Sequence, residues 1–232
     1  MTEKIGHYYR EKLSAELLLK CYTIAPPRIR QYLQAELEYV LSHIAPGDRV
    51  LDLGCGYGRI EPQVAQKAQT VIGIDISRSS LMLGREMFGD IPNCRLVQMD
   101  AARLAFFHEV FDRVFCIQNG ISAFRMDPHQ LVAESIRVTK PGGQLLFSTY
   151  SEKIWNDRLL WFQLQAEAGL IGEIDDRKTG GGTIVCKDGF RATTVTERQF
   201  LEITSNLPVT VAIREVDESS LFCEMRKIDI YL

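Results

Sequence analysis

The sequence has 232 residues, a formal net charge of −3 and a hydrophobic content of 46%. This length suits one domain with a large buried core, and the composition is that of an ordinary soluble globular protein. Proteins that bind long stretches of DNA or RNA need clustered lysine and arginine residues, whereas here these residues are scattered among acidic ones. Nucleic acid is therefore not expected as a partner.

The six cysteines form no C-x-x-C pair and show no spacing from histidine that would build a zinc site. We therefore expect isolated buried thiols and no metal. Residues 1–12 are charged and lack the apolar core of a signal peptide, and no apolar run approaches the ~20 residues that cross a bilayer. These features predict a cytoplasmic protein that does not contact a membrane.

Two helices are predicted at the start of the chain. The first covers residues 7–22, with Leu13, Leu17 and Cys21 on one face, and it ends before a pair of prolines. The second covers residues 28–44 and carries an apolar stripe at helical spacing. We expect the second helix to pack on a sheet, and the first either to do the same or to fold over a ligand.

Residues 50–60 read VLDLGCGYGRI, which predicts a strand, a tight glycine turn and the start of a helix. Glycine tolerates positive φ and has no Cβ, so this turn suits close contact with a ligand. The run departs from the dinucleotide fingerprint, because Gly58 comes one position early and Arg59 occupies the position that should be small. The preceding acid, Asp52, suits an ammonium or sulfonium better than a pyrophosphate.

Four further strands are predicted after the glycine turn, alternating with helices, at residues 70–74, 95–99, 111–117 and 144–149. This alternation favours a parallel sheet with helices on both faces. Polar residues follow three of these strands, namely Asp75, Asp100 and the pair Gln118 and Asn119. The carboxyl ends of parallel strands form the ligand-binding edge of such a sheet, so these residues are candidate site residues.

The last third of the chain differs in character. A helix is predicted over residues 154–168, followed by a hairpin with strands 183–186 and 190–195 around a Lys-Asp-Gly turn. A capping box then opens a short helix at residue 196. Residues 209–216 and 221–228 are predicted to form a terminal antiparallel hairpin.

Four motifs resemble those of the class I S-adenosylmethionine (SAM) dependent methyltransferases, in order and in spacing. The D-x-G-x-G-x-G run at residues 52–58 resembles the first motif, residues 73–77 the second, residues 98–101 the third, and residues 140–143 the turn before the fifth strand. The resemblance implies an α/β, Rossmann-like, doubly wound fold. Its seven-stranded sheet would be mostly parallel with an antiparallel C-terminal strand, and helices would cover both faces.

The resemblance also implies SAM as cofactor and a set of residues around its methionyl end. Gly54, Cys55 and Gly56 would let the backbone approach this part of the cofactor. Asp52 would hold its ammonium group or order the loop, although an acid at this position can also be purely structural. Gln118 would lie near the cofactor after the fourth strand.

At the adenosine end, the resemblance assigns roles to four residues. Asp75 would accept hydrogen bonds from both ribose hydroxyls, and Ile76 would cover one face of the adenine. Asp100 would accept from the adenine amino group, while Ala101 would offer its backbone N–H to the ring. Dehydrogenases use an acid like Asp75 as well, so Asp100 is the better discriminator between SAM and NAD.

Candidate catalytic residues are Asn119, Tyr8 and Tyr9. Methyl transfer from a sulfonium is an in-line displacement that depends on alignment and exclusion of water, and a general base helps only where the acceptor must lose a proton. Asn119 would orient a polar nucleophile, although an Asn-Gly pair is also typical of a plain turn. The two tyrosines lie in a segment that often covers the acceptor pocket in the resembling family, although paired aromatics are also typical of packing.

The sequence thus predicts a SAM-dependent methyltransferase that acts on a nitrogen or oxygen nucleophile of a small-molecule acceptor, as a monomer or homodimer. One alternative is a non-catalytic protein that binds SAM or S-adenosylhomocysteine (SAH). Another is an NAD-dependent dehydrogenase, which Arg59 and Asp100 disfavour. Within one domain we expect N-terminal helices over residues 1–45, a SAM-binding core over 46–150, and a C-terminal part over 151–232. The hairpin at about 172–195 would be a lid or a dimer contact.

Overall fold

The computed structural model describes residues 8, 12–124 and 126–229 of the chain. In chain order its elements are α1 (Glu16–Thr23), α2 (Pro27–Ser42), β1 (Arg49–Leu53), α3 (Glu61–Lys67), β2 (Thr70–Asp75), α4 (Arg78–Phe88), β3 (Cys94–Gln98), β4 (Phe111–Cys116), α5 (Gly120–Ala123), α6 (Pro128–Val138), β5 (Thr139–Tyr150), η3 (Glu152–Ile154), α7 (Trp155–Glu167), β6 (Thr183–Val185), β7 (Arg191–Thr193), α8 (Glu197–Thr204), β8 (Val209–Val216) and β9 (Ser220–Lys227).

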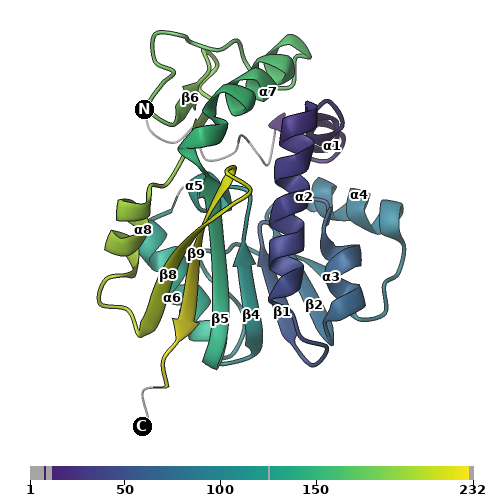
Figure 1. Cartoon of the computed structure of the whole chain (residues 1–232). Coiled ribbons are helices and arrows are strands. Elements are labelled where there is room, and N and C mark those ends of the chain that lie inside the picture. Colours follow the sequence, from purple (N-terminus) through teal and green to yellow (C-terminus); the bar gives the residue numbers. More distant parts are fainter. Residues whose placement is uncertain (1–7, 9–11, 125, 230–232) are drawn as a thin grey trace.

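The main sheet has seven strands in the order β3-β2-β1-β4-β5-β9-β8 (Figure 1). Strands β1 to β5 pair in parallel, whereas β9 runs antiparallel to β5 and β8 antiparallel to β9. This topology confirms the predicted doubly wound sheet with its antiparallel C-terminal strand. Strand order reverses between β1 and β4, which is where open α/β sheets bind ligands.

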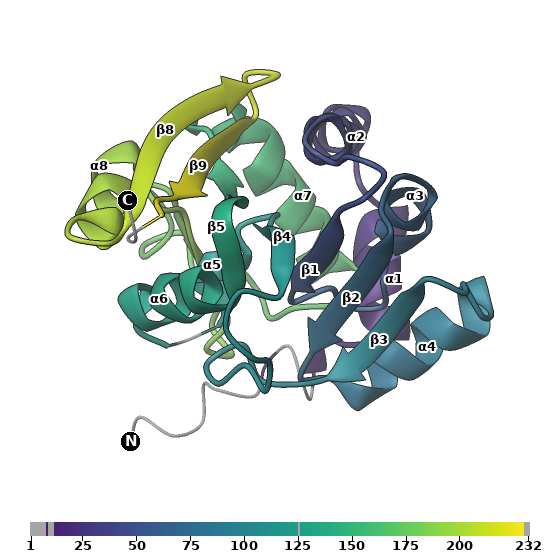
Figure 2. The same cartoon turned by 90° about the horizontal axis from the view of Figure 1, so that it is seen from below.

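Helices cover both faces of this sheet, with α2 and α3 on one side and α6 and α8 on the other (Figure 2). Neighbouring residues of β1 point to opposite faces, so Val50 packs with the α2 and α3 side and Leu51 with the α6 and α8 side. Both are completely buried. This two-sided burial explains why the strands read as continuous apolar runs.

A third layer lies over the carboxyl edge of the strands, formed by α1, α7 and the small β6-β7 sheet (Figure 1). It has its own apolar cluster, in which Tyr32 of α2 packs with Tyr150 at the end of β5 and with Trp161 and Phe162 of α7. Phe190, from the turn between β6 and β7, completes this cluster. The sequence predicted the hairpin and the helix, and the structure places them together above the sheet edge.

Two predicted boundaries are wrong. The first helix was predicted over residues 7–22 without a break, but Ala15 has a φ of 51° and interrupts the helical backbone, so α1 begins at Glu16. Residues 7 and 9–11 of this prediction lie outside the described residues. The predicted apolar face fails as a result, since Leu17 is 43% exposed while Leu13 and Cys21 are buried. Strand β5 begins at Thr139, before the Pro-Gly-Gly turn, because this residue already pairs with Phe111 of β4.

None of the helices in the described part of the chain combines the length and the apolar character that crossing a membrane requires.

Candidate functional site

The loops that follow β1 to β4 meet at a cavity of about 440 Å³, beneath α1, α7 and the β6-β7 hairpin. Its volume falls in the range that is usual for small-molecule and cofactor sites. Most of the residues that the sequence singled out line it, namely Tyr8, Asp52, Gly54, Cys55, Gly56, Asp75, Ile76, Asp100, Gln118 and Asn119. Ala101 is buried beside the cavity without lining it, and Tyr9 lies outside the described residues.

The glycine turn after β1 has the backbone that only glycine adopts easily, with φ values of 77° at Gly54, 59° at Gly56 and 81° at Gly58. The amides of Gly54 and Cys55 both donate to the carbonyl of Ile74, at 2.8 and 3.0 Å, so the turn is held against the end of β2. A Cβ on Gly54 would stand 2.9 Å from the ring of Phe124. The Phe124 ring therefore packs closely on Gly54, and both residues line the cavity.

Asp75, at the end of β2, connects this turn to the next loop. Its Oδ2 accepts from the amide of Gly56 at 2.9 Å, and its Oδ1 accepts from the amide of Ser77 at 2.7 Å. Burial raises the pKa of Asp75, while these backbone donors oppose the shift. Each carboxylate oxygen has a second lone pair available, so the group can still accept from ligand hydroxyls.

Asp52 lies below the turn and is only 5% exposed. Its carboxyl is hydrogen bonded to the carboxyl of Glu61, a residue that sequence reasoning missed. Burial raises the pKa of Asp52 to about 6 and that of Glu61 well above its usual range. Neither oxygen of Glu61 accepts a hydrogen bond from a donor in the described part of the chain, which fits a carboxyl that keeps its proton and donates it to Asp52.

Asp100 and Ala101 follow β3 at the mouth of the cavity. Asp100 is exposed, and its Oδ1 accepts from the amide of Ala102 at 2.9 Å. The side chain of Ala101 packs in the core under the sheet edge, and its backbone amide makes no hydrogen bond to another described residue. Both therefore retain hydrogen-bonding groups for a ligand at this edge.

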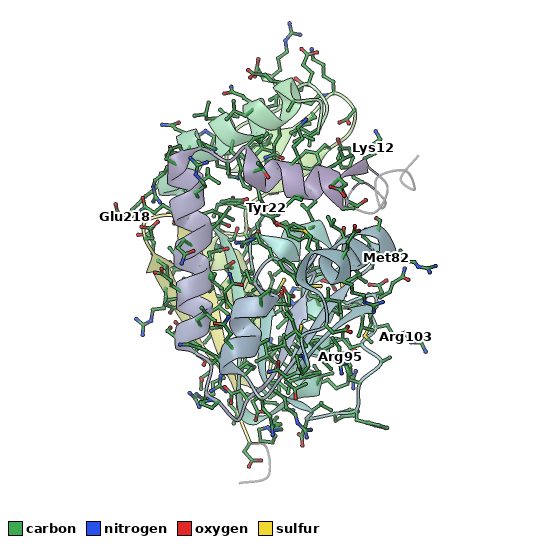
Figure 3. All side chains as sticks on the ribbon, turned by 90° about the vertical axis from the view of Figure 1, so that its right-hand side faces the viewer. Lys12, Tyr22, Met82, Arg95, Arg103 and Glu218 are labelled. Atoms are coloured by element: carbon green, nitrogen blue, oxygen red, sulfur yellow. The ribbon has the colours of Figure 1, made fainter. Side chains whose placement is uncertain are left out.

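Gln118 and Asn119 form a strained turn at the end of β4, with φ values of 54° and 60°. Such left-handed conformations in residues other than glycine cost about 1–3 kcal/mol each and are concentrated at functional sites. The Oε1 of Gln118 accepts from the hydroxyl of Tyr22 at 2.7 Å. This bond connects α1 to the sheet edge, and Figure 3 shows Tyr22 inside the molecule below α1.

The amide of Asn119 holds three neighbouring segments together. Its Nδ2 donates to the carbonyl of Thr193 in β7 at 2.9 Å, and its Oδ1 accepts from the hydroxyls of Thr149 at 2.8 Å and Ser122 at 3.2 Å. Asn119 thus positions the hairpin over the cavity. The predicted direct role on a nucleophile would have to use the remaining N–H of this amide.

Tyr8 joins the start of the described chain to the hairpin. Its hydroxyl donates to Asp188 at 2.8 Å, and its ring lies 4.9 Å from that of Phe190. Burial and the neighbouring Asp188 carboxylate both raise the pKa of Tyr8. In this arrangement Tyr8 is a hydrogen-bond donor that holds the hairpin, and its catalytic role stays a prediction.

Sequence reasoning noted Arg59 only as a misfit to the dinucleotide fingerprint. Its side chain lines the cavity, and the guanidinium lies 5.1 Å from the centre of the Tyr22 ring. The Nη2 atom is buried and has no hydrogen-bond partner among the described residues. A guanidinium nitrogen that faces a cavity without a hydrogen-bond partner among the described residues suits the carboxylate of a bound ligand.

The far side of the cavity carries rings that the motifs did not reveal. Tyr150, Trp161, Phe162 and Phe190 line it together with the amide of Gln165, and we call these five residues the aromatic chamber. A signal was present in the sequence, because Gln165 stands three residues after Phe162 and four after Trp161. It therefore interrupts the buried face of α7 with a polar group.

The residues that the structure describes include no group of three or more histidine, cysteine or acidic side chains placed to hold a metal ion.

Comparison with known proteins gives the following results. Residues 50–143 match the family model described as a methyltransferase domain. The chain is 35% identical over 105 residues to a ubiquinone biosynthesis O-methyltransferase of Pseudomonas fluorescens (strain Pf0-1), an alignment that covers 44% of each protein. It is 33% identical over 121 residues to the ubiquinone/menaquinone biosynthesis C-methyltransferase UbiE of Vibrio vulnificus (strain YJ016), covering 48% of this chain. The chain spans less than half the length of these relatives, at 44% in both cases.

Solved structures resemble the whole fold. The [4+2]-cyclase SpnF superposes with a TM-score of 0.70 at 17% identity, covering 98% of this chain and 96% of SpnF. A SAM-dependent methyltransferase from Aquifex aeolicus gives a TM-score of 0.60 at 16% identity, covering 90% and 98% of the two chains. The N-methyltransferase NodS from Bradyrhizobium japonicum WM9, solved with SAH, gives 0.59 at 14% identity, covering 94% and 100%. At these identities the likeness establishes the fold.

The sheet order, the glycine turn against β2 and the domain match over residues 50–143 converge on one family. Residues 50–143 therefore match a methyltransferase domain and lie in a sheet with the class I fold, and the curated relatives that share this region at 33–35% identity are named as methyltransferases.

Proposed function

We propose that the protein transfers a methyl group from SAM to a nitrogen or oxygen nucleophile of a small-molecule acceptor by in-line displacement. The observation that carries this proposal is the single cavity that contains both the glycine turn with its acidic neighbours and the aromatic chamber. One part has the groups that suit a cofactor, and the other has the apolar surface that suits an acceptor. The relatives whose names refer to quinone biosynthesis support a small-molecule acceptor.

The hydrogen-bonding groups at the cavity fit the chemical groups of SAM. The ionised carboxylate of Asp52 suits the ammonium, and the unpartnered Nη2 of Arg59 suits the methionyl carboxylate. Asp75 has acceptor capacity for the ribose hydroxyls, and Asp100 for the adenine amino group. The cofactor supplies an activated methyl group on a sulfonium.

The chain itself supplies alignment and exclusion of water. The bond from Tyr22 to Gln118 and the bond from Tyr8 to Asp188 hold α1 and the hairpin over the cavity. Alignment of reacting groups in a site closed to water can lower a barrier by about 7–11 kcal/mol in favourable cases. The proposed parts of the domain agree with these contacts. The described residues of the N-terminal part, 1–45, and the hairpin at about 172–195 form the cover, and residues 46–150 form the cofactor side. The hairpin is therefore proposed as a lid.

The first test measures cofactor binding by calorimetry and methyl transfer with methyl-labelled SAM in a small-molecule extract. We expect Asp100→Ala to weaken SAH binding about 10- to 100-fold, because it removes a charged hydrogen-bond acceptor worth about 1.5–3 kcal/mol. The matched control is Asp90→Ala, which changes an exposed aspartate outside this cavity.

The outcomes of this test distinguish a methyltransferase from a non-catalytic SAM-binding protein and test the role of Asp100. Failure of the wild-type chain to bind SAM or SAH would overturn the proposal. Binding without transfer of label to any extract component would favour a non-catalytic SAM-binding protein. Equal losses of SAH affinity in the Asp100 and Asp90 variants would show that Asp100 does not bind the cofactor.

A further inference from the structure

Gln165 of α7 is a buried polar group without a partner in the part of the chain that the structure describes. Its side chain is 3% exposed, lines the cavity and makes no hydrogen bond to another described residue. The amide can donate two hydrogen bonds and accept two, so a polar atom that enters the cavity can bond to it. Because α7 lies outside residues 50–143, this group belongs to the part of the protein that the shared domain does not include.

The surfaces around this amide are aromatic rings. The Trp161 ring lies 5.9 Å from that of Phe162, and Phe162 lies 5.8 Å from Phe190. Tyr22, on the cofactor side, lies 6.2 Å from Trp161. Rings at 4.5–7 Å separations gain energy from stacked and edge-to-face contacts, so such walls favour a planar ring over a puckered one of similar size.

A fixed positive charge lies behind these walls. Arg158 is completely buried, and its guanidinium lies 4.4 Å from the centre of the Tyr150 ring and 5.5 Å from that of Phe162. Two of its N–H groups donate to the carbonyls of Gly182 and Ala192, at 2.9 and 3.0 Å, so the charge is held in place by the hairpin.

This charge influences which acceptor the chamber prefers. The pKa of Tyr150 is raised by burial, and Arg158 opposes that shift, while Glu36 acts in the same direction as burial. Burial also raises the pKa of Glu36. The buried guanidinium of Arg158, 4.4 Å from the centre of the Tyr150 ring and 5.5 Å from that of Phe162, disfavours a cationic ammonium acceptor beside these rings.

We propose that the methyl acceptor is a planar aromatic molecule with an oxygen substituent, bound in the cavity against the rings of the aromatic chamber and hydrogen bonded by the amide of Gln165. This inference rests on the proposed function and specifies its substrate class. Gln165 is assigned as a specificity-determining residue on the acceptor, since it takes no part in the cofactor side of the cavity.

The test uses the full chain saturated with SAH and simple probes in ligand-detected NMR titrations. Catechol is planar and carries two oxygens, trans-cyclohexane-1,2-diol carries the same oxygens on a puckered ring, and benzene is planar without oxygens. We expect catechol to bind more tightly than benzene by about three- to tenfold, for the loss of a hydrogen bond. We expect it to bind more tightly than the diol by about two- to tenfold, for the loss of ring contacts worth about 0.5–1.5 kcal/mol. Equal binding of the diol or of benzene, or no binding of catechol, would overturn the proposal.

The variant Gln165→Leu is expected to weaken catechol binding about three- to tenfold and to leave the Kd for SAH within about twofold. The control Gln163→Leu alters an exposed glutamine of the same helix and should change neither value. If the Gln165 variant retains wild-type catechol affinity, the assignment is wrong. If that variant fails to bind SAH, the catechol affinity of Gln165→Met is measured instead, together with the wild-type affinities for catechol and benzene. A Gln165→Met variant with wild-type catechol affinity, or equal wild-type affinities for the two probes, would show that the Gln165 amide does not bind the acceptor.

These results are separable from a failure of the proposed function. Absence of SAH binding or of methyl transfer by the wild-type chain would count against the methyltransferase proposal. A wrong acceptor class would leave SAH binding intact and change only the ranking of the three probes.

Discussion

Asp52 and Glu61 lie together beneath the glycine turn as buried carboxyl groups, and the raised pKa of Asp52 gives the cofactor site a dependence on pH. The pKa of Asp52 is raised to about 6 by burial, and Glu61 lowers it by donating a hydrogen bond. Only the ionised form of Asp52 attracts an ammonium group strongly. Below pH 6 most of the protein without cofactor therefore carries a neutral Asp52.

We predict that affinity for SAH rises about tenfold between pH 5 and pH 7.5, because only about a tenth of a carboxyl with a pKa near 6 is ionised at pH 5. Calorimetric titration across this range measures the effect. Glu61→Gln retains a donor to Asp52 and should keep the midpoint, whereas Glu61→Met removes the donor and should move the midpoint to higher pH. A flat profile in the wild type would contradict the role of Asp52.

Asn119 connects the β4 end to β7 and β5, so its role is best judged at the scale of these elements. Its amide satisfies the carbonyl of Thr193 and the hydroxyl of Thr149, and its own backbone has a φ of 60°. Two substitutions separate the side-chain hydrogen bonds of Asn119 from its backbone strain. Glycine and alanine both remove the hydrogen bonds, but only glycine also relieves the strain of the positive φ.

We predict that Asn119→Gly lowers the free energy of unfolding by about 1–3 kcal/mol through unsatisfied partners. Asn119→Ala should lower it by about 1–2 kcal/mol more, because alanine is disfavoured at positive φ. Denaturant titrations measure both. Turnover should fall in both variants while SAH affinity stays near that of the wild type, and Ser122→Ala serves as the control for the longest bond. A parallel loss of SAH affinity and turnover would argue against a role in placing the hairpin.

Elements with local signals could be predicted from the sequence. The hairpin follows from its Lys-Asp-Gly turn between apolar runs, and Thr196 caps α8 as expected. The start of α1 could not be predicted, because the break at Ala15 is a backbone conformation that its residue type does not signal. The bond from Asn119 to Thr193 joins residues 74 positions apart, so no local pattern contains it.

The candidate site divides in the same way. Its cofactor side could be predicted, because Asp52, Asp75 and Asp100 follow strands in an order shared by a large family. The aromatic chamber could not, since its residues come from α7 and the hairpin, where no shared motif exists. Gln165 and Arg158 are polar residues on the buried face of a helix. Only the fold shows that Arg158 contacts hairpin carbonyls and that Gln165 lines a cavity.

At the scale of the whole molecule, helix α2 near the start of the described chain contacts the turn between β8 and β9 near its end. Arg28 of α2 contacts Asp217 at 2.5 Å in the turn between β8 and β9, and Glu36 accepts from the hydroxyl of Ser220 at 2.7 Å. Helix α2 in turn leads from α1, which covers the cofactor side of the cavity. A ligand in the cavity therefore contacts segments from both halves of the chain, and its binding energy should stabilise the fold as a unit.

We predict that SAH at about 100 times its Kd stabilises the protein by about 2.7 kcal/mol, because it binds the folded state alone. For a chain of this size each kcal/mol raises Tm by about 2–4 °C, so a shift of about 5–10 °C is expected in a thermal melt. NAD at the same concentration should produce no shift, because Arg59 occupies the position that the dinucleotide fingerprint keeps small and Asp100 suits an adenine amino group at the mouth. Equal shifts in Tm with NAD and SAH would favour the alternative of an NAD-dependent dehydrogenase. If SAH raises Tm and NAD does not, and if the same SAH concentration raises Tm less in Asp100→Ala, then SAH binding through Asp100 stabilises the whole fold.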